Sequence, residues 1–151
     1  MNIEIRDALP EDLPILLHCE QQIVEAERPF NPTLKPGEIH YYDLQEMITN
    51  PLMKVAVGIV ENEIVATGYC KTKKSLPYCS PALYAYIGFI YVAPAHRGNG
   101  FSKQIIDYLC VWAREQGHTE IRLTVYADNM HALKAYEKMG FEQLLVEMRI
   151  K

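Results

Sequence analysis

Hydrophobic residues recur along the chain with two different spacings, which predict alternating strands and helices. An apolar residue at every second position is typical of a half-buried strand, whereas spacings of three and four residues are typical of a helix with one buried face. Proline and glycine residues mark the breaks between these segments. Strands are predicted over residues 3–6, 54–60, 64–73, 82–92, 120–126 and 144–150, and helices over residues 10–27, 39–49, 101–116 and 130–139. The resulting order, β-α-α-β-β-β-α-β-α-β, indicates a mixed α/β fold.

The segment 82–92 is predicted to be the central strand of the sheet. It is rich in tyrosine and isoleucine and almost continuously apolar, as expected of a strand that is buried on both faces. Gly88 interrupts it, and a glycine inside a strand often marks a bulge or a close backbone approach. A bulge there would splay this strand from its next neighbour. The slot thus opened could take an extended ligand that pairs with the strand backbone.

The helix predicted over residues 101–116 covers the sheet. Phe101, Ile105 and Leu109 are spaced to face the strands, and Trp112 continues the same apolar stripe as a core residue. Gly117 follows as the expected C-terminal stop of this helix.

Composition and charge fit one soluble globular domain and narrow the choice of partner. The chain has 151 residues, of which 49% are hydrophobic and 23% charged. Its net charge of −4 argues against a nucleic-acid partner, because phosphate backbones are bound by clustered lysine and arginine. The same charge suits a cationic amine.

The cysteine pattern and the absence of long apolar runs bear on the compartment. No apolar run reaches membrane-spanning length, and the polar start at residues 1–4 is not typical of a signal peptide. We therefore expect a cytoplasmic protein with no membrane partner. Four cysteines without CxxC spacing indicate free thiols and no metal site: Cys19, Cys70, Cys79 and Cys110.

The chemistry is predicted to centre on the loop between the central strand and the helix that follows it. Gly98 and Gly100 lack Cβ atoms, so the backbone can adopt positive φ and a ligand can approach it closely. Backbone N–H groups at the start of the helix would point outward, where the helix dipole also favours an anion. This arrangement predicts a phosphate-bearing ligand, although a purely structural turn would use the same glycines. The Walker pattern does not fit, because no lysine follows Gly100 at the required place. The dinucleotide-binding pattern does not fit, because Lys103 stands where its third glycine should be.

Two motifs resemble those of the GNAT superfamily of N-acetyltransferases. The run Arg97-Gly98-Asn99-Gly100-Phe101-Ser102 is similar to the superfamily's acetyl-CoA pyrophosphate loop, with Ser102 as a departure at the last position. One strand and one helix later, Asn129-x-x-Ala132-x-x-x-Tyr136-Glu137-Lys138-x-Gly140-Phe141 resembles the superfamily signature Asn-x-x-Ala-x-x-x-Tyr-x-Lys-x-Gly-Phe. The resemblance covers essentially the whole chain. It implies a single N-acetyltransferase domain over residues 1–151, built on a twisted, mostly antiparallel sheet with a splayed central strand pair and flanking helices.

The resemblance also implies a cosubstrate, acetyl-CoA, and roles for particular residues, with no metal required. The splayed strand would pair with the pantetheine arm, and the N–H of Ile90 would polarise the thioester carbonyl. Tyr136 would protonate the departing thiolate, unless it is only a core tyrosine. Asn129 would contact the cofactor, although a role as helix cap alone would explain it. The implied cofactor-binding residues are Ile90, Tyr91, Val92, Arg97, Gly98, Asn99, Gly100, Phe101, Ser102, Asn129 and Tyr136.

The sequence leaves the general base and the acceptor open. Some members of the superfamily carry a glutamate on the central strand where this chain has Tyr86, a poor base at neutral pH. Glu25, Glu27, His40 or a water chain could serve instead. The acceptor, a small-molecule or peptide amine, would meet walls formed by residues 28–42 and 75–81. The sequence also leaves open which acyl chain is preferred and whether the protein forms a homodimer.

Three functions follow from these observations. The first is transfer of an acetyl group to a primary amine by direct attack. The second is an acyl-CoA-binding regulator with the same pocket and no turnover. The third is an interaction domain with a vestigial pocket, and intact Gly98, Gly100, Asn129 and Tyr136 argue against it.

Overall fold

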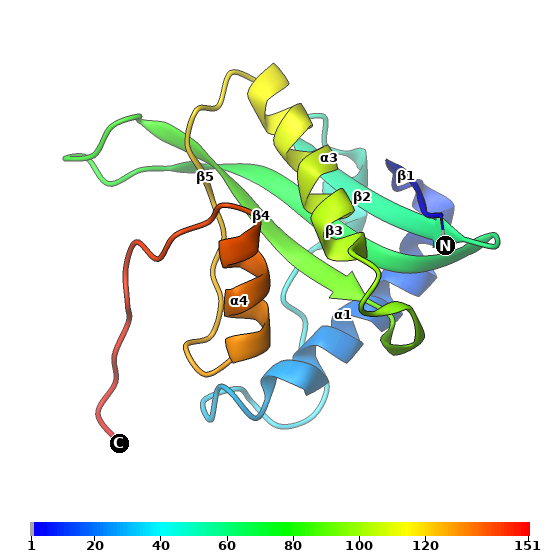
Figure 1. Ribbon diagram of the computed structural model, residues 1–151, viewed down its shortest axis with the longest axis horizontal. Coiled ribbons are helices and arrows are strands. Elements are labelled where there is room, and N and C mark those ends of the chain that lie inside the picture. The colour runs from blue at the N-terminus through cyan, green and yellow to red at the C-terminus, as the bar shows by residue number, and fades with distance from the viewer. Residues whose placement is uncertain (1) are drawn as a thin grey trace.

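A five-stranded sheet in the order β1-β2-β3-β4-β5 forms the centre of the molecule (Figure 1). The computed structural model describes residues 2–151, so Met1, the first residue of the polar start, lies outside the described residues. The strands are β1 (Glu4–Asp7), β2 (Met53–Val60), β3 (Glu63–Lys74), β4 (Leu83–Val92) and β5 (Ile121–Arg122). The helices are α1 (Leu13–Glu27), α2 (Leu44–Thr49), α3 (Phe101–Glu115) and α4 (Met130–Lys138), with short 3-10 turns η1 (Pro10–Asp12) and η2 (Pro94–His96).

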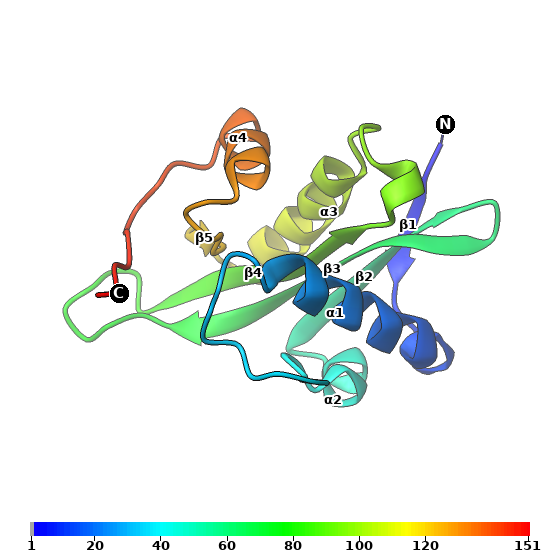
Figure 2. The same ribbon diagram turned by 90° about the horizontal axis from the view of Figure 1, so that it is seen from below.

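Strands β1 to β4 pair antiparallel, and only β4 and β5 run parallel. The mixed, mostly antiparallel sheet expected from the sequence is therefore confirmed. Helices α1 and α2 cover one face and α3 and α4 the other, as Figure 2 shows. On the α1 side, Leu16 and Ile23 pack against Val57 of β2 and Phe89 of β4. On the opposite side, the α3 stripe that contains Ile105 packs in a second core cluster.

The helix predicted over residues 39–49 is shorter in the structure and begins at Leu44. The cause lies in α1, where the fully buried carboxylate of Glu20 accepts hydrogen bonds from the N–H groups of Tyr41 (2.8 Å) and Tyr42 (2.9 Å). Because these two N–H groups are bound to Glu20, residues 39–43 do not form a helix. Asp43 then caps α2 by accepting from the N–H of Glu46.

The last predicted strand, residues 144–150, is wrong for the single chain. After α4 the backbone runs away from the sheet and pairs with no strand of residues 2–151. The strand predicted over residues 120–126 is likewise reduced to β5, since only Ala85 and Tyr86 of β4 pair with it.

The Glu20 network predicts a dependence of stability on pH. His40 Nδ1 lies 2.8 Å from Glu20 Oε1, and this hydrogen bond raises the pKa of His40 above 6.5. A histidine whose pKa is raised by folding stabilises the native state fully below about pH 6.5 and loses that contribution as pH rises through the raised value. We expect urea midpoints of wild type and His40→Gln to converge as pH increases from 5.5 to 8.5. A constant difference between the two urea midpoints across this pH range would contradict the prediction. The control is His18→Gln, since His18 is an exposed histidine of α1.

No helix within residues 2–151 is long and apolar enough to cross a membrane. The four cysteines are free thiols in the structure, with Cys19 and Cys70 buried and Cys79 exposed.

Candidate functional site

The loop between β4 and α3 contains both glycines of the first motif. Gly98 and Gly100 both lie in the left-handed region, with φ of 83° and 75°, and Gly100 is the N-cap residue of α3. A Cβ atom at either position would meet no atom within 4 Å. The loop residues 97–100 are exposed. The loop is therefore open on the side where these Cβ atoms would point, and ligand binding there stays a prediction.

Backbone donors at the start of α3 are left without side-chain caps. Gly100 provides no capping side chain, and the first N–H groups of a helix have no partner within the helix itself. Loop side chains instead stabilise the loop. The Asn99 amide donates to the carbonyl of His96 (3.0 Å), and Arg97 Nε donates to the carbonyl of Val92 (2.9 Å). Arg97 thus joins the loop to the end of β4, and no side chain of residues 2–151 caps the N-terminus of α3.

A bulge in β4 produces the splay expected near Gly88. The pairing register with β3 shifts between Thr67 and Tyr69, and Phe89 has a φ of 57°, a rare value for a residue with a side chain. The buried Thr67 hydroxyl donates to the carbonyl of Phe89 (2.8 Å) and holds this conformation. Gly88 is required because a Cβ there would lie 2.3 Å from the Tyr69 ring.

Beyond this bulge, β4 pairs with no residue of 2–151 on the β5 side. The only β4 residues that pair with β5 are Ala85 and Tyr86, so the later half of β4 borders the splay on that side. Ile90, Tyr91 and Val92, the residues implied to meet the pantetheine arm, lie in this half and are half-buried. The end of β4, the loop and the N-terminus of α3 therefore follow one another directly along the chain.

Helix α4 and its N-cap contain the two predicted site residues of the second motif, Tyr136 and Asn129. The Asn129 side chain accepts from the N–H of Ala132 (3.2 Å), which confirms its role as N-cap. Tyr136 lies two turns later, half-buried, with its ring edge-on to Phe141. Both Tyr136 and Ile90 pack against the same core cluster. Burial first, and then the charges of Glu27 and Tyr86, raise the pKa of Tyr136 to about 12, so its hydroxyl is protonated at neutral pH.

Side chains of the segment after α1 and of β4 contact the chain that follows β5. Phe30, just beyond α1, stacks on Tyr126, which follows β5 (centroids 6.3 Å apart). The neighbouring Asn31 amide donates to the Tyr126 hydroxyl (2.8 Å). The hydroxyls of Tyr86 on β4 and Thr124 are 2.6 Å apart. The segment after α1 therefore forms a wall with the chain that follows β5, and whether this wall meets the acceptor stays a prediction.

Glu27, the last residue of α1, places a carboxylate beside this wall. The side chain is half-buried, and burial raises its pKa above the usual range, opposed by the nearby Tyr41 hydroxyl. That hydroxyl is buried without a well-formed hydrogen bond among the described residues. The negative charge of Glu27 also raises the pKa of Tyr136. Glu27 is therefore an acid of raised pKa within electrostatic reach of the second motif.

The other two candidate bases have different partners. Glu25 is exposed and forms an ion pair with Arg28 (2.9 Å). His40 pairs through Nδ1 with buried Glu20 and lies 3.5 Å from Glu38 through Nε2. Glu20 itself is a residue that the sequence reading missed. Its signal is an acid in the apolar stripe of α1, four residues after Leu16 and four before Val24.

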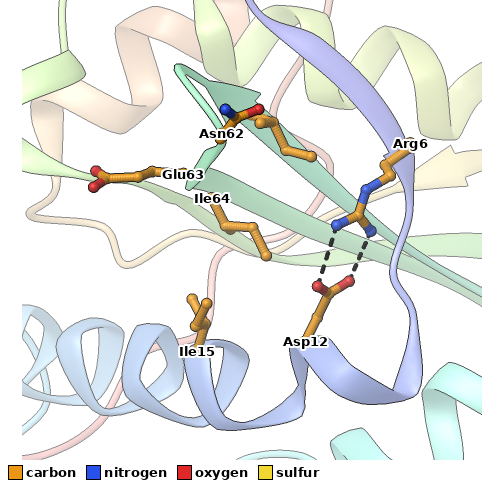
Figure 3. A pocket seen from close by; sticks show the side chains of 7 residues that line it. Arg6, Asp12, Ile15, Asn62, Glu63 and Ile64 are labelled. Carbon is orange, nitrogen blue, oxygen red and sulfur yellow. Dashed lines mark hydrogen bonds and ion pairs between the residues drawn. The ribbon is translucent and has the colours of Figure 1, made fainter.

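A separate hollow of about 380 Å³ lies between β1, the start of α1 and the β2–β3 turn (Figure 3). Its floor contains a two-point ion pair between the Arg6 guanidinium and the Asp12 carboxylate, with distances of 2.7 and 3.1 Å. The hydrogen bond from Arg6 holds the pKa of Asp12 below its usual range. None of the predicted site residues lines this hollow, and the ion pair fixes β1 to η1.

Comparison with known proteins identifies a matching family. The sequence model of the Acetyltransferase (GNAT) family matches residues 20–141. A streptothricin acetyltransferase from Streptomyces lavendulae is 40% identical over 52 residues, which are 34% of this chain and 28% of that protein. The curated relatives are matched over only 25% to 41% of their own length.

Solved structures share the fold over almost the full chain. A mutant of the BH1408 protein from Bacillus halodurans superposes with a TM-score of 0.88 at 20% identity, covering 98% of both chains. A predicted acetyltransferase from Clostridium acetobutylicum, solved with acetyl-CoA, has a TM-score of 0.73 at 21% identity, covering 99% of this chain and 96% of the other. At these identities the likeness shows a common fold.

Proposed function

Because this chain belongs to the Acetyltransferase (GNAT) family, we propose that it transfers an acetyl group from acetyl-CoA to a primary amine. The observation that carries the proposal is the open loop at Gly98 and Gly100, which lies at the N-terminus of α3 and beside the splayed half of β4. A diphosphate at the loop and an extended arm along the strand would place a thioester near Tyr136. We take residues 1–151 to act as one N-acetyltransferase domain.

The proposed binding mode uses main-chain donors. N–H groups of the loop and of the first turn of α3 would bind the pyrophosphate, since they lack side-chain caps and sit at the positive end of the helix dipole. The later half of β4, from Ile90 to Val92, would hydrogen-bond the pantetheine arm. Asn129 would approach the cofactor from α4 while its side chain caps that helix. No metal is needed for this chemistry.

In the proposed reaction, the amine nitrogen attacks the thioester carbonyl carbon and forms a tetrahedral intermediate with a negatively charged oxygen. The N–H of Ile90 would donate to that oxygen and stabilise the charge as it develops. When the C–S bond breaks, Tyr136 would give its proton to the departing thiolate. Burial that raises the pKa of Tyr136 to about 12 keeps this proton in place until then. The same apolar surroundings disfavour a free thiolate, so they promote the transfer.

Glu27 is the base we assign. An alkyl ammonium has a pKa of about 10.4 and must lose a proton to become nucleophilic. The Glu27 carboxylate would attract the ammonium to the wall formed by Phe30 and Tyr126 and accept that proton directly or through water. Its burial raises its pKa, which makes it a better proton acceptor than an exposed glutamate. A positively charged amine also suits the net charge of −4.

Because a streptothricin acetyltransferase is among the relatives of this chain, we favour a small-molecule amine as the acceptor. The direct test is release of CoA thiol when the protein is incubated with acetyl-CoA and a panel containing an aliphatic diamine, an aminoglycoside and a lysine peptide. Amine-dependent release supports the transferase. CoA binding without release on any amine would instead support the acyl-CoA-binding regulator. Absence of thermal stabilisation by CoA would contradict both.

Replacing Glu27 with glutamine tests the proposed base. We expect Glu27→Gln to lower kcat/KM for the amine by about 10²-fold, because general-base catalysis typically contributes that much or more. In wild type, the rate should fall as pH drops through the raised pKa of Glu27, and the variant should lose this acidic limb. The matched control is Glu25→Gln, two residues earlier and exposed, which should leave kcat/KM and its pH profile unchanged. Equal rates in wild type and Glu27→Gln would remove Glu27 from the mechanism.

A further inference from the structure

The α1 side of the sheet carries positive charge where β3 ends and β4 begins. Figure 2 shows this part of the sheet extending beyond helices α1 and α2. Lys71 of β3 pairs in register with Tyr86 of β4, and two residues later Lys73 pairs with Tyr84. Residues two apart in a strand, and residues paired across two strands, lie on one face. That face is the α1 side, because Tyr69 and Tyr86 both belong to the core packed against α1.

The two lysine ammonium groups lie over aromatic rings and have no acidic partner. Lys73 Nζ is 3.7 Å from the ring centroid of Tyr86, and Lys71 Nζ is 5.8 Å from that of Tyr69. Neither lysine forms an ion pair with an acid of residues 2–151. Burial, and then the charge of Lys71, lower the pKa of Lys73. In a chain with a net charge of −4, these two half-buried lysines therefore form a local positive site.

This positive site adjoins the proposed acceptor site and lies away from the glycine loop. The Tyr86 ring that contacts Lys73 has its hydroxyl 2.6 Å from that of Thr124. Thr124 is two residues before Tyr126, which forms the wall beside the end of α1. Along β4, Tyr86 precedes Ile90 by four residues, about 13 Å of strand. The glycine loop follows the far end of β4, so a pyrophosphate bound there leaves both lysines available for another anion.

We propose that the amine acceptor of this protein carries a carboxylate or phosphate group, which Lys71 and Lys73 bind. The inference rests on the proposed function and names the class of acceptor for that site. The Glu27 carboxylate attracts the ammonium end of such a molecule, and the lysines attract its anionic end and repel the ammonium. No ion pair joins Glu27 to either lysine, so the two charges stay apart. Opposite charges at the two ends of the site thus orient the acceptor.

Matched acceptors with and without the anionic group test this inference. The carboxylates are ω-amino acids of increasing length, from β-alanine to ω-aminooctanoate, each compared with its terminal amide. Phosphate monoesters of amino alcohols, compared with the free amino alcohols, distinguish a phosphate-bearing acceptor from a carboxylate. We expect kcat/KM for the best anionic acceptor to exceed that of its neutral counterpart at least about 10-fold, mainly through KM, because hydrogen bonds to charged groups contribute about that much. Neutral acceptors that react equally fast would overturn the inference and leave the proposed function supported.

Replacing both lysines shows whether they cause the preference. We expect Lys71→Gln/Lys73→Gln to reduce the ratio of kcat/KM between anionic and neutral acceptors to within about twofold. The matched control is Lys74→Gln, since Lys74 is exposed, ends β3 and lies on the opposite face from Lys73. The control should keep the wild-type ratio within about twofold. A preference that survives the double change would overturn the inference.

Binding measured without turnover separates this inference from the proposed reaction. Protein saturated with CoA, which has no acetyl group to transfer, is titrated with the same pairs of acceptors. We expect the best anionic member to bind at least about 10-fold more tightly than its neutral counterpart, and Lys71→Gln/Lys73→Gln to lose this difference. Equal affinities in wild type, or no binding of any anionic amine, would overturn the inference. Preferential binding without CoA release from acetyl-CoA by any of these amines would support the anion site and contradict acetyl transfer.

Discussion

Gly100→Val is expected to abolish CoA binding while the protein stays folded. The residue has a φ of 75°, and its Cβ direction is open, so a valine side chain would fill the space that the pyrophosphate is proposed to occupy. Hydrogen bonds to a charged group contribute about 1.5–3 kcal/mol each, so loss of two or three of them weakens binding at least about 100-fold. Isothermal titration with CoA measures the effect directly.

Gly117→Val is the matched control for this change. Gly117 lies at the other end of α3, also with positive φ (91°) and also with open space in its Cβ direction. Both valines pay roughly 1–2 kcal/mol or more of backbone strain, so their melting temperatures should fall by similar amounts. Only Gly100→Val should lose CoA. If both variants bind CoA like wild type, the loop is not the cofactor site.

Local patterns predicted the elements whose stability depends on near neighbours in the sequence. The spacing of Phe101, Ile105 and Leu109 fixed the buried face of α3, and all three are buried. Asn129 was predicted as a cap and is one. The position of Gly88 pointed to the bulge, although the residue with unusual backbone is its neighbour Phe89. In each case the physical cause lies within a few residues.

Contacts between distant segments explain what the sequence did not predict. The helix over residues 39–49 lost its first turn because Glu20, some twenty residues earlier, binds the N–H groups that would start it. The strand over residues 144–150 has the alternation of a strand, but it pairs with no other strand among residues 2–151. Our proposal of Glu27 over Glu25 and His40 rests on side-chain positions, because the structure pairs Glu25 with Arg28 and His40 with Glu20. A period of two or 3.6 residues carries no information of this kind.

Tyr136→Phe is expected to lower kcat by about 10²- to 10³-fold and to leave CoA affinity within about threefold. The change removes one hydroxyl and keeps the ring that packs against Phe141. If the hydroxyl protonates the thiolate only as the C–S bond breaks, its loss affects the transition state and not the bound cofactor. A lower kcat with unchanged CoA affinity is the signature to look for in steady-state rates and titrations with CoA.

Tyr108→Phe separates this catalytic effect from the general loss of a buried tyrosine hydroxyl. Tyr108 also has a pKa raised to about 12, by burial and by its hydrogen bond to Asp7 (2.5 Å), but it lies on α3 outside both motifs. Its replacement should cost stability, about 0.5–1.5 kcal/mol for one hydrogen bond, and leave kcat unchanged. A poorer leaving group needs its proton more, so acyl donors whose departing thiol has a lower pKa should be less sensitive to Tyr136→Phe. Equal sensitivity across such donors, or an unchanged kcat with acetyl-CoA, would show that Tyr136 supports the core and does not act as the acid.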